Sequence, residues 1–183
     1  LEVTVVYRDD ESVEYALDWV YPGGIGAAYG TPADDERDSR AEGEIAGRVE
    51  TTWAERDDLP LGAREVLRAA DAAAFATRVL PALDLLDDVR VITRGPVPAF
   101  RELRGDPSLT ITAVPSPDRD WFDLGIVVVI DGRTIPFGTL FSALSRGRTR
   151  IKLSDGAWFS LAHPSLQRLR DMLEEAAELD EWE

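Results

Sequence analysis

Residues 120–161 read DWFDLGIVVVIDGRTIPFGTLFSALSRGRTRIKLSDGAWFSL, and this stretch has the most regular pattern in the chain. Its β-branched and aromatic segments are interrupted by Asp131-Gly132 and Asp155-Gly156, dipeptides that favour tight hairpin turns. Between the two turns, Leu140, Phe141 and Leu144 have the spacing of one helical face. The stretch predicts strands at 121–130, 133–136, 148–153 and 157–161 and a helix at 137–145.

A second, amphipathic helix is predicted at residues 165–179, because its leucines recur every three to four positions. Together these elements predict a ββαββα unit over residues 118–183, ending in an acidic tail. The tail either leads toward a further part of the protein or docks on a basic surface. We expect Trp182, within the tail, to pack in the full-length protein and to be exposed in this fragment.

The region before this unit, residues 1–115, predicts a mixture of strands and helices. Gly and Pro mark residues 21–35 as a loop, and Gly43 and Gly47 weaken the helix that follows by roughly 1 kcal/mol each relative to Ala. Pro81 is expected to break or restart a second helix. The predicted elements are a hairpin of 2–7 and 13–19, helices at 36–56 and 64–80, and strands at 89–93 and 109–114. Pro115-Ser116-Pro117-Asp118 is the predicted boundary, and the predicted fold class is α+β with short antiparallel strands, as two regions or as one continuous domain.

The composition excludes several kinds of chemistry. The 183 residues contain no cysteine, which rules out disulfides, thiolate catalysis and cysteine-ligated zinc. No apolar run approaches the roughly 20 residues of a membrane span, and the N-terminus lacks a signal-peptide pattern, so we expect a cytoplasmic protein with no membrane partner. The chain starts at Leu1 within a strand-like segment, which suggests a fragment of a longer protein.

The charge is strongly negative but uneven. The net charge is −15, which disfavours nucleic-acid binding by the chain as a whole. Residues 1–60 carry sixteen acids and five bases, and residues 171–183 carry seven acids and no base. Residues 61–170 have a small excess of bases, fifteen against twelve acids, so the net charge alone does not decide the partner.

The C-terminal pattern resembles the helicase-associated region of bacterial Swi/Snf-type helicases, which precedes the two motor lobes in those proteins. The order and spacing of its residues carry the resemblance over about 120–175, and no sharp motif extends it into 1–115. The residues that match the family pattern include Trp121, Phe122, Asp123, Gly132, Gly156 and Trp158, most of them with an expected structural role.

The resemblance implies a non-catalytic accessory domain that positions or regulates a DNA-dependent ATPase or its DNA. The motor lobes are the implied partners, and DNA is a further candidate partner. ATP and magnesium would bind outside these residues, because a phosphate-binding loop needs Gly-Lys-Ser/Thr and the only lysine, Lys152, lies between Ile151 and Leu153. We therefore expect no cofactor in this chain and no enzymatic activity of its own.

Four basic residues alternate from the end of the predicted helix into a strand: Arg146, Arg148, Arg150 and Lys152. Side chains two apart in a strand share a face, so the four form a candidate contact for DNA backbone or for an acidic surface of the motor. The competing interpretation is a solvated strand face that pairs with the chain's own carboxylates. Trp121, Phe122, Trp158 and Phe159 are likewise either base-stacking platforms or, more in keeping with strand alternation, packing residues.

Two further interpretations concern the remaining polar residues. His163, the only histidine, precedes Pro164 at a predicted helix start and is expected to have a structural or capping role. The carboxylates at 9–11, 34–36 and 57–58 lack a calcium-loop pattern and are read as solvated loops. The alternative function is a free-standing acidic module that binds a basic protein. The sequence makes no prediction of the oligomeric state.

Overall fold

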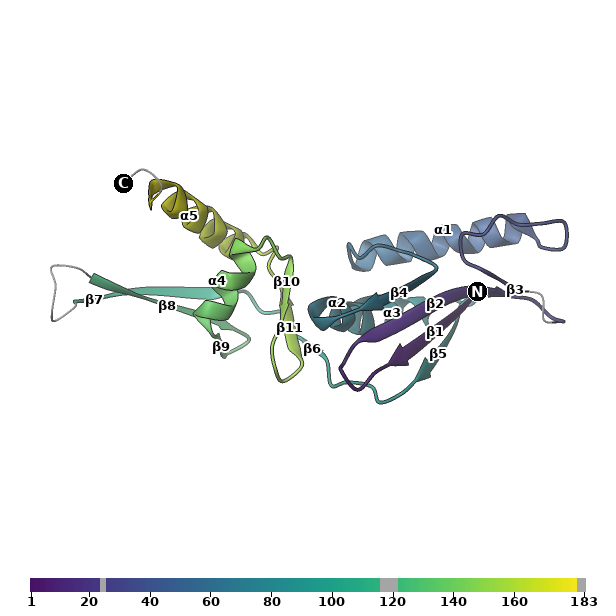
Figure 1. The fold of residues 1–183 in the computed structure, drawn as a ribbon, viewed down its shortest axis with the longest axis horizontal. Helices are drawn as coiled ribbons and strands as arrows, with labels where there is room; N and C mark the ends of the chain where they lie inside the picture. Colours follow the sequence, from purple (N-terminus) through teal and green to yellow (C-terminus); the bar gives the residue numbers. More distant parts are fainter. Residues whose placement is uncertain (24–25, 116–121, 181–183) are drawn as a thin grey trace. The chain divides into compact units, whose positions relative to one another are not determined.

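The computed structural model describes residues 1–23, 26–115 and 122–180, and it confirms an α+β fold (Figure 1). Its contacts divide the chain into two compact units. Unit 1 comprises Leu1–Glu102 with Ser154–Gly156, and unit 2 comprises Leu103–Leu153 with Ala157–Glu183. This division differs from the predicted one at 115–118, because the strands on either side of that boundary pair with each other over eight residues.

Unit 1 is built on a sheet whose first two strands form the predicted hairpin. The strands are β1 (Glu2–Tyr7), β2 (Val13–Val20), β3 (Gly26–Ala28), β4 (Arg64–Leu67) and β5 (Arg90–Arg94), in the order β3-β2-β1-β5 with β4 also on β2. β1 and β2 are antiparallel, whereas β1 and β5 are parallel, which departs from the predicted antiparallel pairing. A short strand, β6 (Arg101–Glu102), was not predicted.

One face of this sheet is covered by helices and forms the core of unit 1. Val3, Val5 and Tyr7 alternate as buried residues along β1, as a one-sided sheet requires. The ring of Tyr15 on β2 stacks on Phe75 at 5.0 Å and meets Trp53 of α1 (Ser39–Arg56) at 5.4 Å. These contacts fix α1 on the sheet, and Figure 1 shows it lying along the strands.

The helix predicted at 64–80 is wrong in its first part. Residues 64–67 form β4 on the edge of β2, so Val66 belongs to a strand and not to a helical stripe. Ala69 then adopts a φ of +49°, which an L residue seldom does. Alanine is a strong helix former, so nothing in its side chain signals this break.

The second helix continues through Pro81 by way of a π turn. α2 (Ala69–Ala74) leads into the π-helical η1 (Phe75–Val79) and then α3 (Leu80–Leu83), with Pro81 in the first turn of α3. A proline in a regular helix clashes with the carbonyl four residues earlier, and a π turn at this point rearranges those carbonyls. The expected break or restart at Pro81 is thus observed as a restart, in which α3 begins directly after the π turn.

Unit 2 contains the predicted ββαββα order. Its elements are β8 (Phe122–Ile130), β9 (Arg133–Ile135), α4 (Phe137–Ser145), β10 (Arg150–Lys152), β11 (Ala157–Ser160) and α5 (Pro164–Asp180). β7 (Ser108–Pro115) joins β8 and β9 in a three-stranded sheet of order β7-β8-β9. Asp131 and Gly132 have φ of +49° and +72°, the positive values that the predicted hairpin turn requires.

The core of unit 2 forms where α4 and α5 meet these strands. The sheet contributes Val128, Ile130 and Ile135, α4 contributes Leu140 and Leu144, and α5 contributes Leu166 and Leu169. The leucine stripe predicted for the last helix is therefore confirmed for Leu166 and Leu169, with Leu173 packed on the margin of the core. The side chain of Ala176 lies outside the described residues.

Candidate interaction surface

The four basic residues predicted to share one strand face are divided between a helix end and a short strand. Arg146 caps the C-terminus of α4, and Arg148 lies between α4 and β10. Only Arg150 and Lys152 belong to β10, and Arg150 is buried while Lys152 is half-buried. β10 starts later than predicted because residues 148 and 149 belong to the segment that leaves α4. Arg146 and Arg148 are the exposed members of the set.

The helix exit holds Arg146 and Arg148 on a fixed backbone. Gly147, with φ of +65°, donates its amide to the carbonyl of Leu144 at 3.0 Å, and Arg148 donates its amide to the carbonyl of Ala143 at 3.0 Å. This pair of hydrogen bonds is a Schellman motif, which ends a helix at a left-handed glycine. The glycine, rather than strand alternation, thus sets where the two arginines lie.

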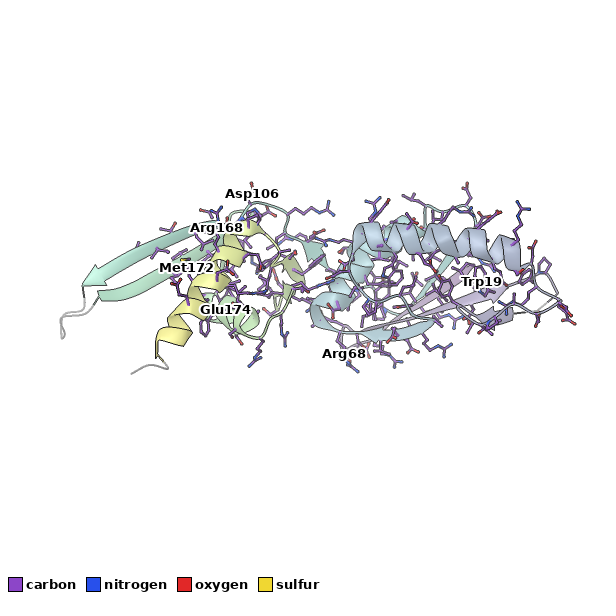
Figure 2. All side chains as sticks on the ribbon, turned by 90° about the horizontal axis from the view of Figure 1, so that it is seen from above. Trp19, Arg68, Asp106, Arg168, Met172 and Glu174 are labelled. Carbon is purple, nitrogen blue, oxygen red and sulfur yellow. The ribbon has the colours of Figure 1, made fainter. Side chains whose placement is uncertain are left out.

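A third arginine supports this turn from the last helix. Arg170 of α5 donates from Nη2 to the carbonyl oxygen of Arg148 at 2.8 Å, and Arg168 is exposed two residues earlier. Beyond Arg170, the exposed charged residues of the described part of α5 are acidic: Asp171, Glu174 and Glu175. Figure 2 labels Arg168 and Glu174 on this helix. The basic surface of unit 2 therefore centres on the α4 exit and the first half of α5, and sequence spacing gave no sign of the part played by Arg170.

This arrangement has two chemical uses. Exposed guanidinium groups can contact phosphates or carboxylates of a partner. An arginine at a helix C-terminus also stabilises the negative end of the helix dipole, by roughly 0.3–1 kcal/mol. Stabilisation of the helix dipole involves only Arg146. This structural role therefore does not explain why Arg148 is exposed.

The residues that carry the family pattern have structural roles wherever the structure describes them. Trp158 is fully buried and Phe159 is 1% exposed, so neither is an exposed base-stacking platform. Gly156 has a φ of +82°, and a Cβ there would lie 2.6 Å from the carbonyl oxygen of Ala99. Trp121 and the side chains of Phe122 and Asp123 lie outside the described residues.

His163 caps the last helix, as predicted. Its Nδ1 accepts a hydrogen bond from the amide of Ser165 at 3.2 Å, and its carbonyl oxygen accepts from the amide of Leu166 at 2.9 Å. Its Nε2 lies 3.3 Å from the carboxylate of Asp106. The imidazole ring therefore caps the N-terminus of α5, since an acceptor at that position satisfies a backbone amide that has no partner within the helix.

The acidic segments are built into turns and ion pairs of unit 1. Asp10 accepts from the amide and the hydroxyl of Ser12, hydrogen bonds that lower the pKa of its carboxyl group. Asp57 ends α1, accepts from the amide of Leu59 at 3.2 Å and lies 3.2 Å from Nη1 of Arg78. Within the described ranges, no group of three or more acidic or histidine side chains is arranged to hold a metal ion.

A buried ion pair between Arg37 and Glu42 was not predicted. Arg37 also donates to the carbonyl oxygens of Pro32 and Thr31 at 3.1 and 3.2 Å, and the hydroxyl of Tyr21 donates to Glu42 at 3.0 Å. These contacts tie the loop before α1 to the helix. Charged residues pair along a helix when they are three or four positions apart. Arg37 and Glu42 are five positions apart, so the sequence did not indicate this ion pair.

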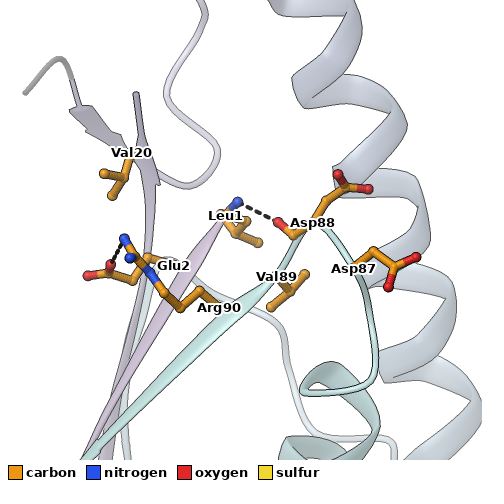
Figure 3. A pocket seen from close by; sticks show the side chains of 7 residues that line it. All are labelled: Leu1, Glu2, Val20, Asp87, Asp88, Val89 and Arg90. Atoms are coloured by element: carbon orange, nitrogen blue, oxygen red, sulfur yellow. Dashed lines mark hydrogen bonds and ion pairs between the residues drawn. The ribbon is translucent and has the colours of Figure 1, made fainter. Parts of the chain in front are cut away.

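A small pocket lies at the edge of the unit 1 sheet (Figure 3). Its volume is about 180 Å³, below the roughly 300–1,000 Å³ of ligand pockets. It surrounds the first residue, whose amino group donates to the carbonyl oxygen of Asp88 at 2.7 Å. The pocket is lined by Leu1, Glu2, Val20, Asp87, Asp88, Val89 and Arg90. We assign no ligand to it.

Comparisons with models of known protein families, with curated proteins and with solved structures found no match to this chain. Among the helices that the structure describes, none is both long enough and apolar enough to cross a membrane.

Proposed function

We propose that this chain is a non-catalytic accessory domain of a bacterial Swi/Snf-type DNA-dependent ATPase, acting in the cytoplasm. The proposal rests on the resemblance over residues 120–175 and on one observation, the exposed pair Arg146 and Arg148 on the fixed exit of α4. In this proposal, the two arginines contact the DNA backbone or an acidic surface of the motor and so couple DNA engagement to ATP hydrolysis. ATP and magnesium would bind the motor lobes, outside this chain.

The charge of the chain favours a contact through a few residues over a contact that covers much of the surface. The net charge of −15 repels a polyanion from most of the surface, but that repulsion between exposed charges is screened beyond about 8 Å at physiological salt. A contact restricted to Arg146 and Arg148 therefore remains compatible with an acidic chain. Two phosphate contacts would give a shallow salt dependence, with a slope of about −2 in a plot of log affinity against log salt.

The test is DNA-stimulated ATPase activity of the full-length parent, which must first be shown to contain the motor. The variant Arg146→Glu/Arg148→Glu is expected to lose most of the stimulation while basal hydrolysis persists. The matched control is Arg40→Glu/Arg94→Glu, which changes the net charge equally at two exposed positions of unit 1. Unchanged stimulation in the first variant would overturn the proposed role of the arginine pair.

Removing residues 1–183 from the parent separates the possible mechanisms. Lost stimulation with intact basal hydrolysis would indicate coupling, whereas higher basal hydrolysis would indicate that the domain restrains the motor. No change in either activity would contradict the accessory role.

A second candidate is a free-standing acidic module that binds a basic protein. It is favoured by the exposed carboxylates of α5, Asp171, Glu174 and Glu175, and by the acidic composition of residues 1–60. The reading frame distinguishes the two. Continuation past Glu183 into a Gly-Lys-Thr phosphate loop supports the accessory domain, and a stop codon there supports the free-standing module.

A further inference from the structure

The β7–β8 hairpin of unit 2 has a long, uncharged edge strand. β7 reads SLTITAVP and contains no charged residue. It pairs with β8 over eight residues, from Ser108 opposite Val129 to Pro115 opposite Phe122. Among the residues that the structure describes, β7 has no strand on its other side. An edge of this kind offers a full row of backbone donors and acceptors to another strand.

Among the side chains that the structure describes in this hairpin, some are covered by the core of unit 2 and others are exposed. Val128 is buried, and Leu109 and Ile126 pack against the core. Ile111, opposite Ile126 on the same face, is 52% exposed, and Val127 on the other face is 42% exposed. A two-stranded ribbon without a covered face is only marginally stable in water, and at Ile111 and Val127 this one leaves more than two fifths of each side chain exposed.

The edge also lacks the usual protection against pairing. Edge strands are commonly protected by inward-pointing charges, lysines, bulges or a central proline. β7 has a proline only at its end, Pro115, and its ladder with β8 runs without a bulge. We infer that the outer edge of β7 pairs with the same edge of a second copy of this chain, forming a symmetric dimer with a continuous sheet β8-β7-β7-β8.

The strand is self-complementary in this arrangement. In an antiparallel pair centred on Ile111, that residue faces its own counterpart, Thr110 faces Thr112 and Leu109 faces Ala113, so each pair lies on one face of the sheet. The exposed Ile111 side chains then cover each other. Because the contact is isologous, both β7 edges are used at once and the assembly closes at two copies.

Charge favours a second copy at this edge over association elsewhere. Each chain carries −15, so most of its surface repels another copy. The paired strands are neutral, and the antiparallel register places the bases of the two hairpins about six residues apart, roughly 20 Å. That separation exceeds the Debye length of about 8 Å at physiological salt, so repulsion between charges at the two bases is screened. This inference does not depend on the proposed function.

The first test is sedimentation equilibrium of the chain 1–183. We expect a monomer–dimer equilibrium within concentrations up to about 100 μM, a weak specific association. Ile111→Lys places two like charges opposite each other and is expected to raise the dissociation constant at least tenfold. The matched control, Val127→Lys, makes the same change on the inner strand and is expected to leave it within about twofold. A monomer throughout this range, or an open series of larger species, would overturn the inference.

A cysteine scan tests the register independently of stability. The chain has no cysteine, so a single introduced cysteine forms a disulfide only with another copy. Ile111→Cys is expected to cross-link on mild oxidation, because directly opposed residues have Cα atoms about 4.5–5.5 Å apart, within disulfide range. Val127→Cys and Ser108→Cys are expected to stay reduced. Cross-linking at position 127 or 108 in preference to 111 would contradict the proposed edge. Circular dichroism of each variant is the control for folding.

Discussion

Arg37 and Glu42 form a bidentate ion pair that is almost inaccessible to water. Nε of Arg37 lies 2.8 Å from Oε1 of Glu42, and Nη2 lies 2.6 Å from Oε2. Their side chains are 3% and 9% exposed. Because each charge is desolvated, the pair contributes to stability only while both members are ionised and in place.

The first prediction concerns the acid stability of unit 1. Hydrogen bonds from Arg37 hold the pKa of Glu42 below its usual value of 4.5, and the Tyr21 hydroxyl acts in the same direction, while burial and Asp38 oppose them. A carboxylate with a depressed folded-state pKa stabilises the fold above its unfolded pKa, and this stability is lost as the pH falls through the folded value. Glu42→Gln removes the titrating group. We therefore expect the urea midpoint of Glu42→Gln to fall less steeply than that of the wild type below about pH 4.5.

At neutral pH the same variant is expected to be less stable than the wild type, because the Arg37 charge keeps its burial but loses its counter-charge. Glu44→Gln is the control, since its partner Arg40 is 90% exposed and such pairs contribute little. Parallel pH profiles for Glu42→Gln and the wild type would show that the pair does not titrate with folding.

The second prediction separates packing from base stacking at Trp158. This side chain is fully buried, so Trp158→Ala is expected to reduce the free energy of unfolding by about 3–5 kcal/mol, as for other large-to-small core changes. Phe141→Ala, at a side chain that is 43% exposed, is expected to cost about 1 kcal/mol. Urea denaturation followed by circular dichroism measures both. Retained stability in Trp158→Ala would contradict the assignment to the core.

The third prediction uses two glycines with opposite expected effects. Gly156→Ala is expected to destabilise by about 2 kcal/mol or more, because the φ of +82° disfavours an L residue and the new Cβ would approach the carbonyl oxygen of Ala99. Gly138→Ala lies in α4 with open space around the new methyl group and is expected to stabilise by about 0.5–1 kcal/mol. Thermal unfolding of the two variants checks the signs, and a stabilising Gly156→Ala would refute the tight-turn assignment.

The fourth prediction tests the cap of α5. His163→Ala removes the acceptor for the Ser165 amide and is expected to cost about 0.5–1.5 kcal/mol, whereas His163→Asn keeps an acceptor and is expected to cost less. Asp106→Ala distinguishes capping from the ion pair, because Asp106 is fully accessible and its removal is expected to cost under about 0.5 kcal/mol. Equal losses in His163→Ala and Asp106→Ala would assign the effect to the ion pair instead.

Local signals were sufficient for the order of elements in unit 2. The helix at 137–145 is observed at its predicted residues, and the last helix within one residue of its predicted bounds. Asp131-Gly132 fixed the turn because both residues tolerate positive φ, and His163 marked the start of α5 because an acceptor before Pro164 suits a cap. In unit 1, the first hairpin was predictable because its strands are close in sequence and alternate in polarity.

Long-range contacts decided what the sequence left open. Residues 64–67 carry a helical pattern but form β4, because their pairing with the edge of β2 outweighs helix propensity. The proposed basic face over Arg146–Lys152 is divided because the backbone hydrogen bonds at the α4 exit, rather than strand alternation, set the direction of the first two arginines. Burial of Arg150 and Trp158, and the contact of Arg170 with the Arg148 carbonyl, depend on residues from separate elements. The sequence alone thus determined the elements whose stabilising contacts are local, and the tertiary structure decided which charges are buried and which are exposed.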